Sequence, residues 1–122
     1  MVKRIYMNQY FMSFELTKSE KKIAREIIEI GLQKEYAKGL FQFDSILVKW
    51  KDKKLDSREA YQQLYDKLIR CDKHIARRYD RMSGSNYLFI IAAQLIDGVI
   101  SEKDLEKFSE QTKQAIKLIA NI

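Results

Sequence analysis

The stretch from residue 17 to residue 51 constrains the fold more than any other feature, because it is long, helical in its spacing and free of proline. The whole chain of 122 residues has no proline and only 4 glycines. A sandwich or barrel has many turns, and these two residue types form most of them. The sequence therefore predicts an all-α protein.

The same stretch has the features of one long helix. Thr17, followed three residues later by Glu20, forms a capping box that satisfies two backbone donors at a helix start. Further along, the apolar residues are spaced four and three apart in alternation, which is the heptad pattern of a seam between helices. The seam residues are Tyr36, Leu40, Phe43, Leu47 and Trp50. An earlier isoleucine stripe is out of register with this seam, and Gly31 and Gly39 lie near the junction, where the helix could bend.

The length of this helix predicts a homodimer. A helix over residues 18–51 would be on the order of 50 Å long at 1.5 Å per residue, whereas a compact domain of this size is about 35 Å across. An apolar seam that extends past the core must be covered, and a second copy of the chain would cover it most simply. We therefore expect the seam to be a dimer interface, with a kinked, folded-back monomer as the alternative.

Three more segments follow the long helix. Residues 56–59 would cap a medium helix, which ends before the Ser, Gly and Asn of residues 83–86. Residues 88–96 are apolar on nearly all sides, as in a short central helix, with Gly98 as its left-handed stop. Residues 101–104 would cap a final amphipathic helix. The last two helices are expected to form a compact C-terminal head.

Residues 1–16 differ from the rest of the chain. Apolar side chains recur here at even positions, which is the period-2 pattern of an extended segment with one buried face. These side chains are Tyr6, Tyr10, Met12, Phe14 and Leu16. We expect a short strand or an N-terminal arm that lies on a partner, with a helix as the alternative. Residues 17–122 would then form a single all-helical domain.

The net charge of +6 and the pI near 9.4 would suit a nucleic acid or an acidic membrane surface as partner. Lysine and arginine are, however, interleaved with aspartate and glutamate along most of the chain. The dense basic patches are Lys49, Lys51, Lys53 and Lys54, then Arg77, Arg78 and Arg81. We therefore expect a solvated or protein-binding surface, with nucleic-acid binding by a basic helical dimer as the alternative. No membrane span is expected, because the longest apolar run, 88–96, is far shorter than the roughly 20 residues required.

No catalytic residue, metal site or cofactor is predicted. The one histidine, His74, lies near Asp72 and Cys71, but residues one to three apart on a helix need not converge, and no third orienting group accompanies them. The acidic residues lack the Glu-x-x-His companions of a helical metal site, and no glycine-rich phosphate loop is present. A single cysteine and a start too polar for a secretory segment favour the reducing cytoplasm.

Two segments in the second half of the chain form a pair of motifs. The chain has Leu-Tyr-Asp-Lys-Leu at residues 64–68, and Tyr79, Asp80 and Arg81 follow with Tyr79 thirteen residues after Asp66. This pair resembles the fluorescence recovery protein family of cyanobacteria, which has Trp-x-x-His-Asp-Phe-Leu and Lys-Tyr-Asp-Tyr-Arg segments at the same interval. The apolar run 88–96 is also similar to a Phe-Val-Phe-Ala run in the family.

The resemblance extends into the first half of the chain. Glu20 and residues 35–37 are similar to the Ser-x-x-Glu and Ala-Tyr-x-Arg-Glu patterns of the family, so the likeness covers roughly residues 17–120. It implies an all-helical dimer that binds the C-terminal domain of photoactivated orange carotenoid protein and returns that protein to its resting form. Such a protein is not an enzyme. It shifts a conformational equilibrium by binding one state better than the other.

The binding positions implied by the family are mostly changed in this chain. The binding Trp of the family falls on Gln62, beside Tyr61; its His falls on Tyr65; its Asp is kept as Asp66. Its later Arg falls on Asp72, with Arg70 close by, and its head Phe falls on Ile90. The partner-binding residues expected here are Tyr61, Gln62, Tyr65, Asp66, Arg70, Arg81 and Ile90. Scaffold positions match better than binding positions, which predicts a divergent relative that keeps the dimer and has a different target.

Overall fold

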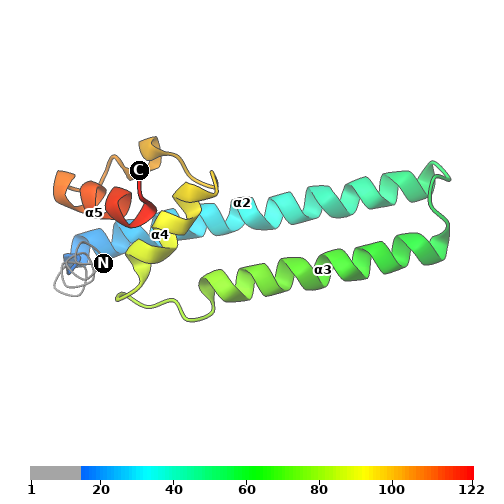
Figure 1. Cartoon of the computed structure of the whole chain (residues 1–122), viewed down its shortest axis with the longest axis horizontal. Coiled ribbons are helices and arrows are strands. Elements are labelled where there is room, and N and C mark those ends of the chain that lie inside the picture. The colour runs from blue at the N-terminus through cyan, green and yellow to red at the C-terminus, as the bar shows by residue number, and fades with distance from the viewer. Residues whose placement is uncertain (1–14) are drawn as a thin grey trace. The chain divides into compact units, whose positions relative to one another are not determined.

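The computed structural model describes residues 15–122 and is helical throughout, with no strand among these residues (Figure 1). The elements in chain order are α2 (Lys18–Lys51), α3 (Ser57–Tyr79), α4 (Tyr87–Ile96), the short 3-10 helix η1 (Glu102–Leu105) and α5 (Glu110–Ala120). The all-α prediction is therefore confirmed. The strand or arm expected over residues 1–16 falls, apart from its last two residues, outside the described part of the chain.

The chain divides into two compact units. One consists of Met1–Glu29 with Met82–Ile122, and we call its described part the head unit. The other is Ile30–Arg81, which we call the hairpin unit. The long helix α2 belongs to both, because its first turns lie in the head unit and the remainder lies in the hairpin unit.

The head unit has a well-buried apolar core. In Figure 1, α4, η1 and α5 gather around the first turns of α2, and α4 packs directly on α5. The side chains of Ile28, Ile91, Leu105 and Ile116 are at most 1% exposed. The fully buried Gln94 donates from Nε2 to the backbone oxygen of Ile28 at 3.1 Å, which ties α4 to α2. The expected central helix over 88–96 is thus confirmed.

The expected stop and caps of the head are confirmed in part. Gly98 has a φ of +70°, the left-handed conformation that favours glycine, and its N–H donates to the oxygen of Leu95. The capping box of Ser101 and Asp104 is present, but it begins only the four-residue η1. The last helix starts later, at Glu110, so the prediction of one helix from this cap was wrong. The chain turns between the two because Leu105 and Phe108 both enter the core.

The start of α2 is tied to the start of α5. The N–H of Glu20 donates to the Thr17 hydroxyl at 3.1 Å, as the capping box predicts. The Glu20 carboxylate also accepts from the Thr112 hydroxyl at 2.7 Å and from the N–H of Ser109, which is the cap of α5, at 3.2 Å. Burial opposes the charge on Glu20, but these hydrogen bonds outweigh it and lower the pKa of its carboxyl. An ionised Glu20 therefore stabilises both helix starts.

In the hairpin unit, α3 runs back beside α2 (Figure 1). Asp56 caps α3 by accepting from the N–H of Glu59 at 2.8 Å, as expected from residues 56–59. At the turn, Trp50 donates from Nε1 to the Ser57 hydroxyl at 3.0 Å. The hydrogen bond between Trp50 and Ser57 therefore links the end of α2 to the start of α3.

Candidate interaction surface

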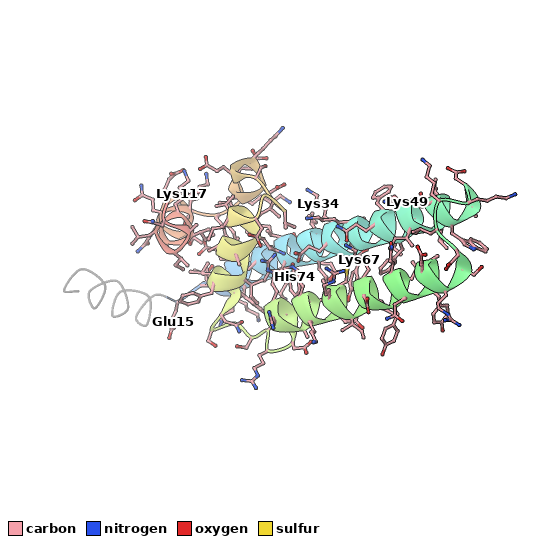
Figure 2. The ribbon with its side chains drawn as sticks, turned by 45° about the vertical axis from the view of Figure 1, so that its right-hand side comes forward. Glu15, Lys34, Lys49, Lys67, His74 and Lys117 are labelled. Carbon is pink, nitrogen blue, oxygen red and sulfur yellow. The ribbon has the colours of Figure 1, made fainter. Side chains whose placement is uncertain are left out.

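The contact between α2 and α3 includes a largely buried carboxylate, that of Glu35. Its side chain is 8% exposed, and its Oε1 lies 2.7 Å from Nη1 of Arg78 and 2.6 Å from Nε2 of His74. The hydroxyl of Tyr79 donates to the other carboxylate oxygen. Figure 2 shows His74 on α3 within this arrangement. The cluster joins residues about 40 positions apart, so no local pattern in the sequence could predict it.

The residues first considered for catalysis have structural roles. His74 forms its hydrogen bond with Glu35 on the facing helix. Cys71 packs near Gly39, where a Cβ added to the glycine would lie 3.5 Å from the Cys71 sulfur. Among the residues that the structure describes, no three His, Cys, Asp or Glu side chains are grouped to hold a metal ion.

One side of the hairpin carries exposed apolar residues on both helices. Successive residues of a helix are about 100° apart, so the seam of α2 lies to one side of the inward-facing Glu35, Gly39 and Ile46. The tyrosines of α3 lie to the same side of its inward-facing Cys71 and Arg78. We call this surface the apolar flank and define it by Tyr36, Leu40, Phe43, Leu47 and Trp50 on α2, and by Tyr61, Tyr65 and Leu68 on α3.

Exposure along the apolar flank is high for residues of this type. Leu40 is 64% exposed and Tyr61 is 76% exposed, while Tyr36, Trp50, Tyr65 and Leu68 are exposed by 41% to 54%. Phe43 and Leu47 are half-buried. Because α2 is one continuous helix, the chain does not kink to cover its own seam. The predicted seam is thus available to another molecule.

Further apolar residues of α2 were missed by the sequence analysis. Phe41 is 76% exposed and Val48 is 46% exposed, and they lie seven residues apart on the side of α2 that faces away from α3. Their spacing was the available signal, but the stronger heptad of the seam concealed it. Helix α2 is therefore apolar over a wider arc than one seam requires.

The predicted partner-binding residues divide into two stripes on α3. Tyr61 and Tyr65 lie on the apolar flank. Gln62, Asp66 and Arg70 form the next stripe, in which Gln62 donates from Nε2 to Oδ1 of Asp66 at 3.1 Å and Arg70 donates from Nε to the Asp66 backbone oxygen at 3.5 Å. The structure thus brings these three polar residues together and separates them from the tyrosines.

The other two predicted residues differ in their exposure. Arg81 is exposed directly after α3. Ile90 is only 6% exposed and belongs to the head core, so its expected role as a surface contact is corrected. The exposed apolar residue beside it is Phe89, which is 51% exposed. Because α4 is apolar on nearly all sides, its sequence could not indicate which residue faces outward.

The opposite side of the hairpin carries a polar groove of about 320 Å³. Its lining includes Gln42, Ser45 and Lys49 from α2, and Gln63, Lys67 and Arg70 from α3. Figure 2 shows Lys49 and Lys67 on the two helices. Of the two predicted basic patches, the first contributes Lys49 to this groove. The second is weakened, because Arg78 has a side chain only 11% exposed and pairs with Glu35.

Comparison of the chain with protein-family models, with curated proteins and with solved structures gave no match. The resemblance to the fluorescence recovery protein family therefore stays a prediction based on the motifs. No helix within residues 15–122 combines the length and the apolar character that a membrane span requires.

Proposed function

We propose that the protein is a non-enzymatic regulator that forms a homodimer through the α2 part of the apolar flank, the seam, and binds a protein partner through α3, as the fluorescence recovery protein family does. The observation that carries this proposal is the exposure of the seam, with Leu40 at 64% and Tyr36 at 48%. Large contiguous apolar patches on a protein surface mark interaction sites. Aromatic residues are also enriched in the cores of such sites.

The polar groove between α2 and α3 gives a second reason for a partner. Midway along the hairpin, its groove is lined mainly by polar and charged residues, with Ile46 as the apolar exception. A pair of helices that buries little between its members gains little from packing alone. Burying a leucine or another large apolar side chain contributes about 1.5 to 3 kcal/mol, so covering the flank would supply the missing stabilisation.

A second copy of the chain is the proposed occupant of the seam. A two-fold interface places the same patch of each copy against the other, so an apolar patch is matched by an apolar patch. Two hairpins joined through their α2 seams would bring four helices together, with the α2 helices in contact and the tyrosines of α3 left for the partner. Because the chain carries a net charge of +6, contact through the uncharged seam also avoids repulsion between copies.

The proposed partner-binding face is α3, with Tyr61, Tyr65, Asp66 and Arg81. Tyr and Arg are the residue types that most often dominate binding energy at interfaces. The proposed target is the C-terminal domain of orange carotenoid protein or a domain related to it, since Gln62 and Tyr65 stand where the family has its binding Trp and His. Regulation follows if this face binds one state of the target better than the other.

The dimer is tested by a pair of adjacent substitutions, Leu40→Asp and Phe41→Asp. Both residues are exposed on α2, but only Leu40 lies on the apolar flank. Sedimentation velocity should give the unchanged protein twice the chain mass of 14.5 kDa. Leu40→Asp should dissociate it to monomers, and Phe41→Asp should leave it dimeric. Equal effects of the two substitutions would contradict an interface along the seam.

Partner binding is tested separately with light-activated orange carotenoid protein. Gel filtration should show co-elution, and the return to the resting form should be faster with the protein than without it. Tyr65→Ala should weaken the complex, whereas Lys34→Ala, on α2, should not. A dimer that forms no complex and does not change recovery would remove the carotenoid role and leave the dimer proposal intact.

The alternative function, nucleic-acid binding by the basic dimer, has weaker support. The exposed Lys51, Lys53 and Lys54 near the α2–α3 turn favour it, but the engagement of Arg78 with Glu35 does not. Binding of this kind would fall steeply with salt. If a polyanion column shows no salt-sensitive retention of the protein, nucleic-acid binding is excluded.

A further inference from the structure

The polar groove of the hairpin combines side chains from facing stripes of two helices. Residues 42, 45, 46 and 49 of α2 and residues 63, 66, 67 and 70 of α3 line it, each set at the spacing of one helix face. These positions border the inward-facing residues of the two helices on one side of the hairpin. Apart from Ile46 they are polar, and they enclose a space of about 320 Å³.

Three cations lie along this groove without a carboxylate partner. Lys49, Lys67 and Arg70 all line it, and no acidic side chain among residues 15–122 forms an ion pair with any of them. The one carboxylate in the groove, Asp66, accepts a hydrogen bond from Gln62 instead. Like charges that share a groove repel one another, and a bound anion would relieve this repulsion.

We propose that this groove is a binding site for a small molecule that carries a phosphate group. Three cations less the charge of Asp66 leave two positive charges, which match the charge of about −1.5 to −2 on a phosphate monoester at pH 7. Arg70 can donate two parallel hydrogen bonds to phosphate oxygens, and the two lysines act as point charges. The neutral Gln42, Ser45 and Gln63 supply further donors.

The size and chemistry of the groove favour a small anionic ligand over an apolar one. A volume of about 320 Å³ is at the small end of ligand sites, which span roughly 300 to 1,000 Å³. An apolar ligand would leave the three cations desolvated without a partner, so it is disfavoured. The groove lies on the side of the hairpin opposite the apolar flank, so this proposal is independent of the proposed dimer.

The proposal is tested by NMR titration with inorganic phosphate, with chloride used to hold the ionic strength constant. The amide signals of Ser45 and Gln63, and the side-chain amides of Gln42 and Gln63, should shift in a saturable way. The double variant Lys67→Gln/Arg70→Gln should bind at least about tenfold more weakly, because it loses two charge-assisted contacts. The matched control Lys22→Gln/Lys34→Gln also removes two positive charges but lies outside the groove, and it should bind as the unchanged protein does.

Two results would overturn the proposal. One is a lack of saturable shifts in the unchanged protein. The other is an equal loss of affinity in the two double variants, which would show a response to net charge alone. A short single-stranded oligonucleotide is titrated in parallel. If both double variants weaken its binding equally and phosphate does not bind in a saturable way, the protein has a diffuse polyanion-binding surface and no phosphate site in the groove. Circular dichroism and sedimentation of each variant separate these outcomes from loss of the fold or of the dimer.

Discussion

The head unit and the hairpin unit use similar apolar contents in opposite ways. In the head, Ile91 and Ile116 are fully buried, and Leu105 is 1% exposed. In the hairpin, Leu40 and Tyr61 are exposed by more than 60%, and the contact between the helices includes the polar cluster of Glu35. The difference indicates that the head buries its apolar residues within one chain, whereas the hairpin has polar ties between its helices and leaves an apolar flank exposed, which the proposed second copy would cover in part.

The largest expected effect is in the head core. Ile116→Ala should lower the free energy of unfolding by about 4 kcal/mol, because it removes buried methyl groups and leaves a cavity. Its neighbour Leu118 is 46% exposed, so Leu118→Ala should change stability by less than about 1 kcal/mol. Urea unfolding at one protein concentration measures both. Similar losses in the two variants would contradict the burial of Ile116 in the head core, which is one side of the contrast with the hairpin.

The next effect is in the polar tie of the hairpin. Glu35→Ala should destabilise the protein by about 3 kcal/mol, because it removes the carboxylate that pairs with the largely buried Arg78. His74→Ala should cost less, since the His74 side chain is 48% exposed. Thermal unfolding followed by circular dichroism gives both values. A larger loss from His74→Ala than from Glu35→Ala would contradict the assignment of Arg78 as the main partner.

A smaller effect concerns the pH dependence of the head. The pKa of Glu20 is lowered in the fold, so its contribution is complete above the ordinary value of 4.5 and is lost as the pH falls through the folded pKa. The free energy of unfolding should therefore decline below about pH 4.5. In Glu20→Gln this decline should be smaller by about 1 kcal/mol, which is the typical contribution of a helix cap. Urea unfolding at pH 7 and at pH 3 measures the difference. The same decline in both proteins would remove Glu20 as its source.

The smallest effect comes from two glycines, one in each unit. Gly39→Ala should stabilise the hairpin by about 0.5 to 1 kcal/mol, because alanine favours helix and its Cβ would make an ordinary contact with Cys71. Gly98→Ala should destabilise the head by about 1 kcal/mol, because its φ of +70° strains any side chain. The two changes in melting temperature should have opposite signs. Destabilisation by Gly39→Ala would show tighter packing between the helices than the structure has.

Local signals in the sequence predicted most of the helices. The absence of proline in the whole chain predicted helices in general. The cap at Asp56 and the stop at Gly98 each depend on a few neighbouring residues, and both are confirmed. The cap at Ser101 was placed correctly but its helix was not, because a cap indicates where a helix begins and not where it ends. The length of η1 depends on burial of Leu105 and Phe108, which is a tertiary effect.

The surfaces were less predictable than the helices. The seam of α2 was recognised from its spacing, and Tyr36, Leu40 and Trp50 are indeed exposed. The cluster around Glu35 and the groove with Lys67 depend on which residues of α3 face α2, and this register is set by the turn and not by either helix alone. Ile90 was misplaced because α4 has no polar side to orient it.

Coverage of the α2 seam by a second copy of the chain is tested most directly by dilution of the unchanged protein. The only tryptophan of the chain, Trp50, lies on the flank and is 41% exposed in a single copy, so its fluorescence reports whether the flank is covered. Sedimentation velocity and Trp50 emission are measured on the same dilution series. The account predicts a species of twice 14.5 kDa that dissociates on dilution, with a red shift of the emission at the same concentration. A single species of 14.5 kDa at every concentration, with unchanged emission, would contradict it.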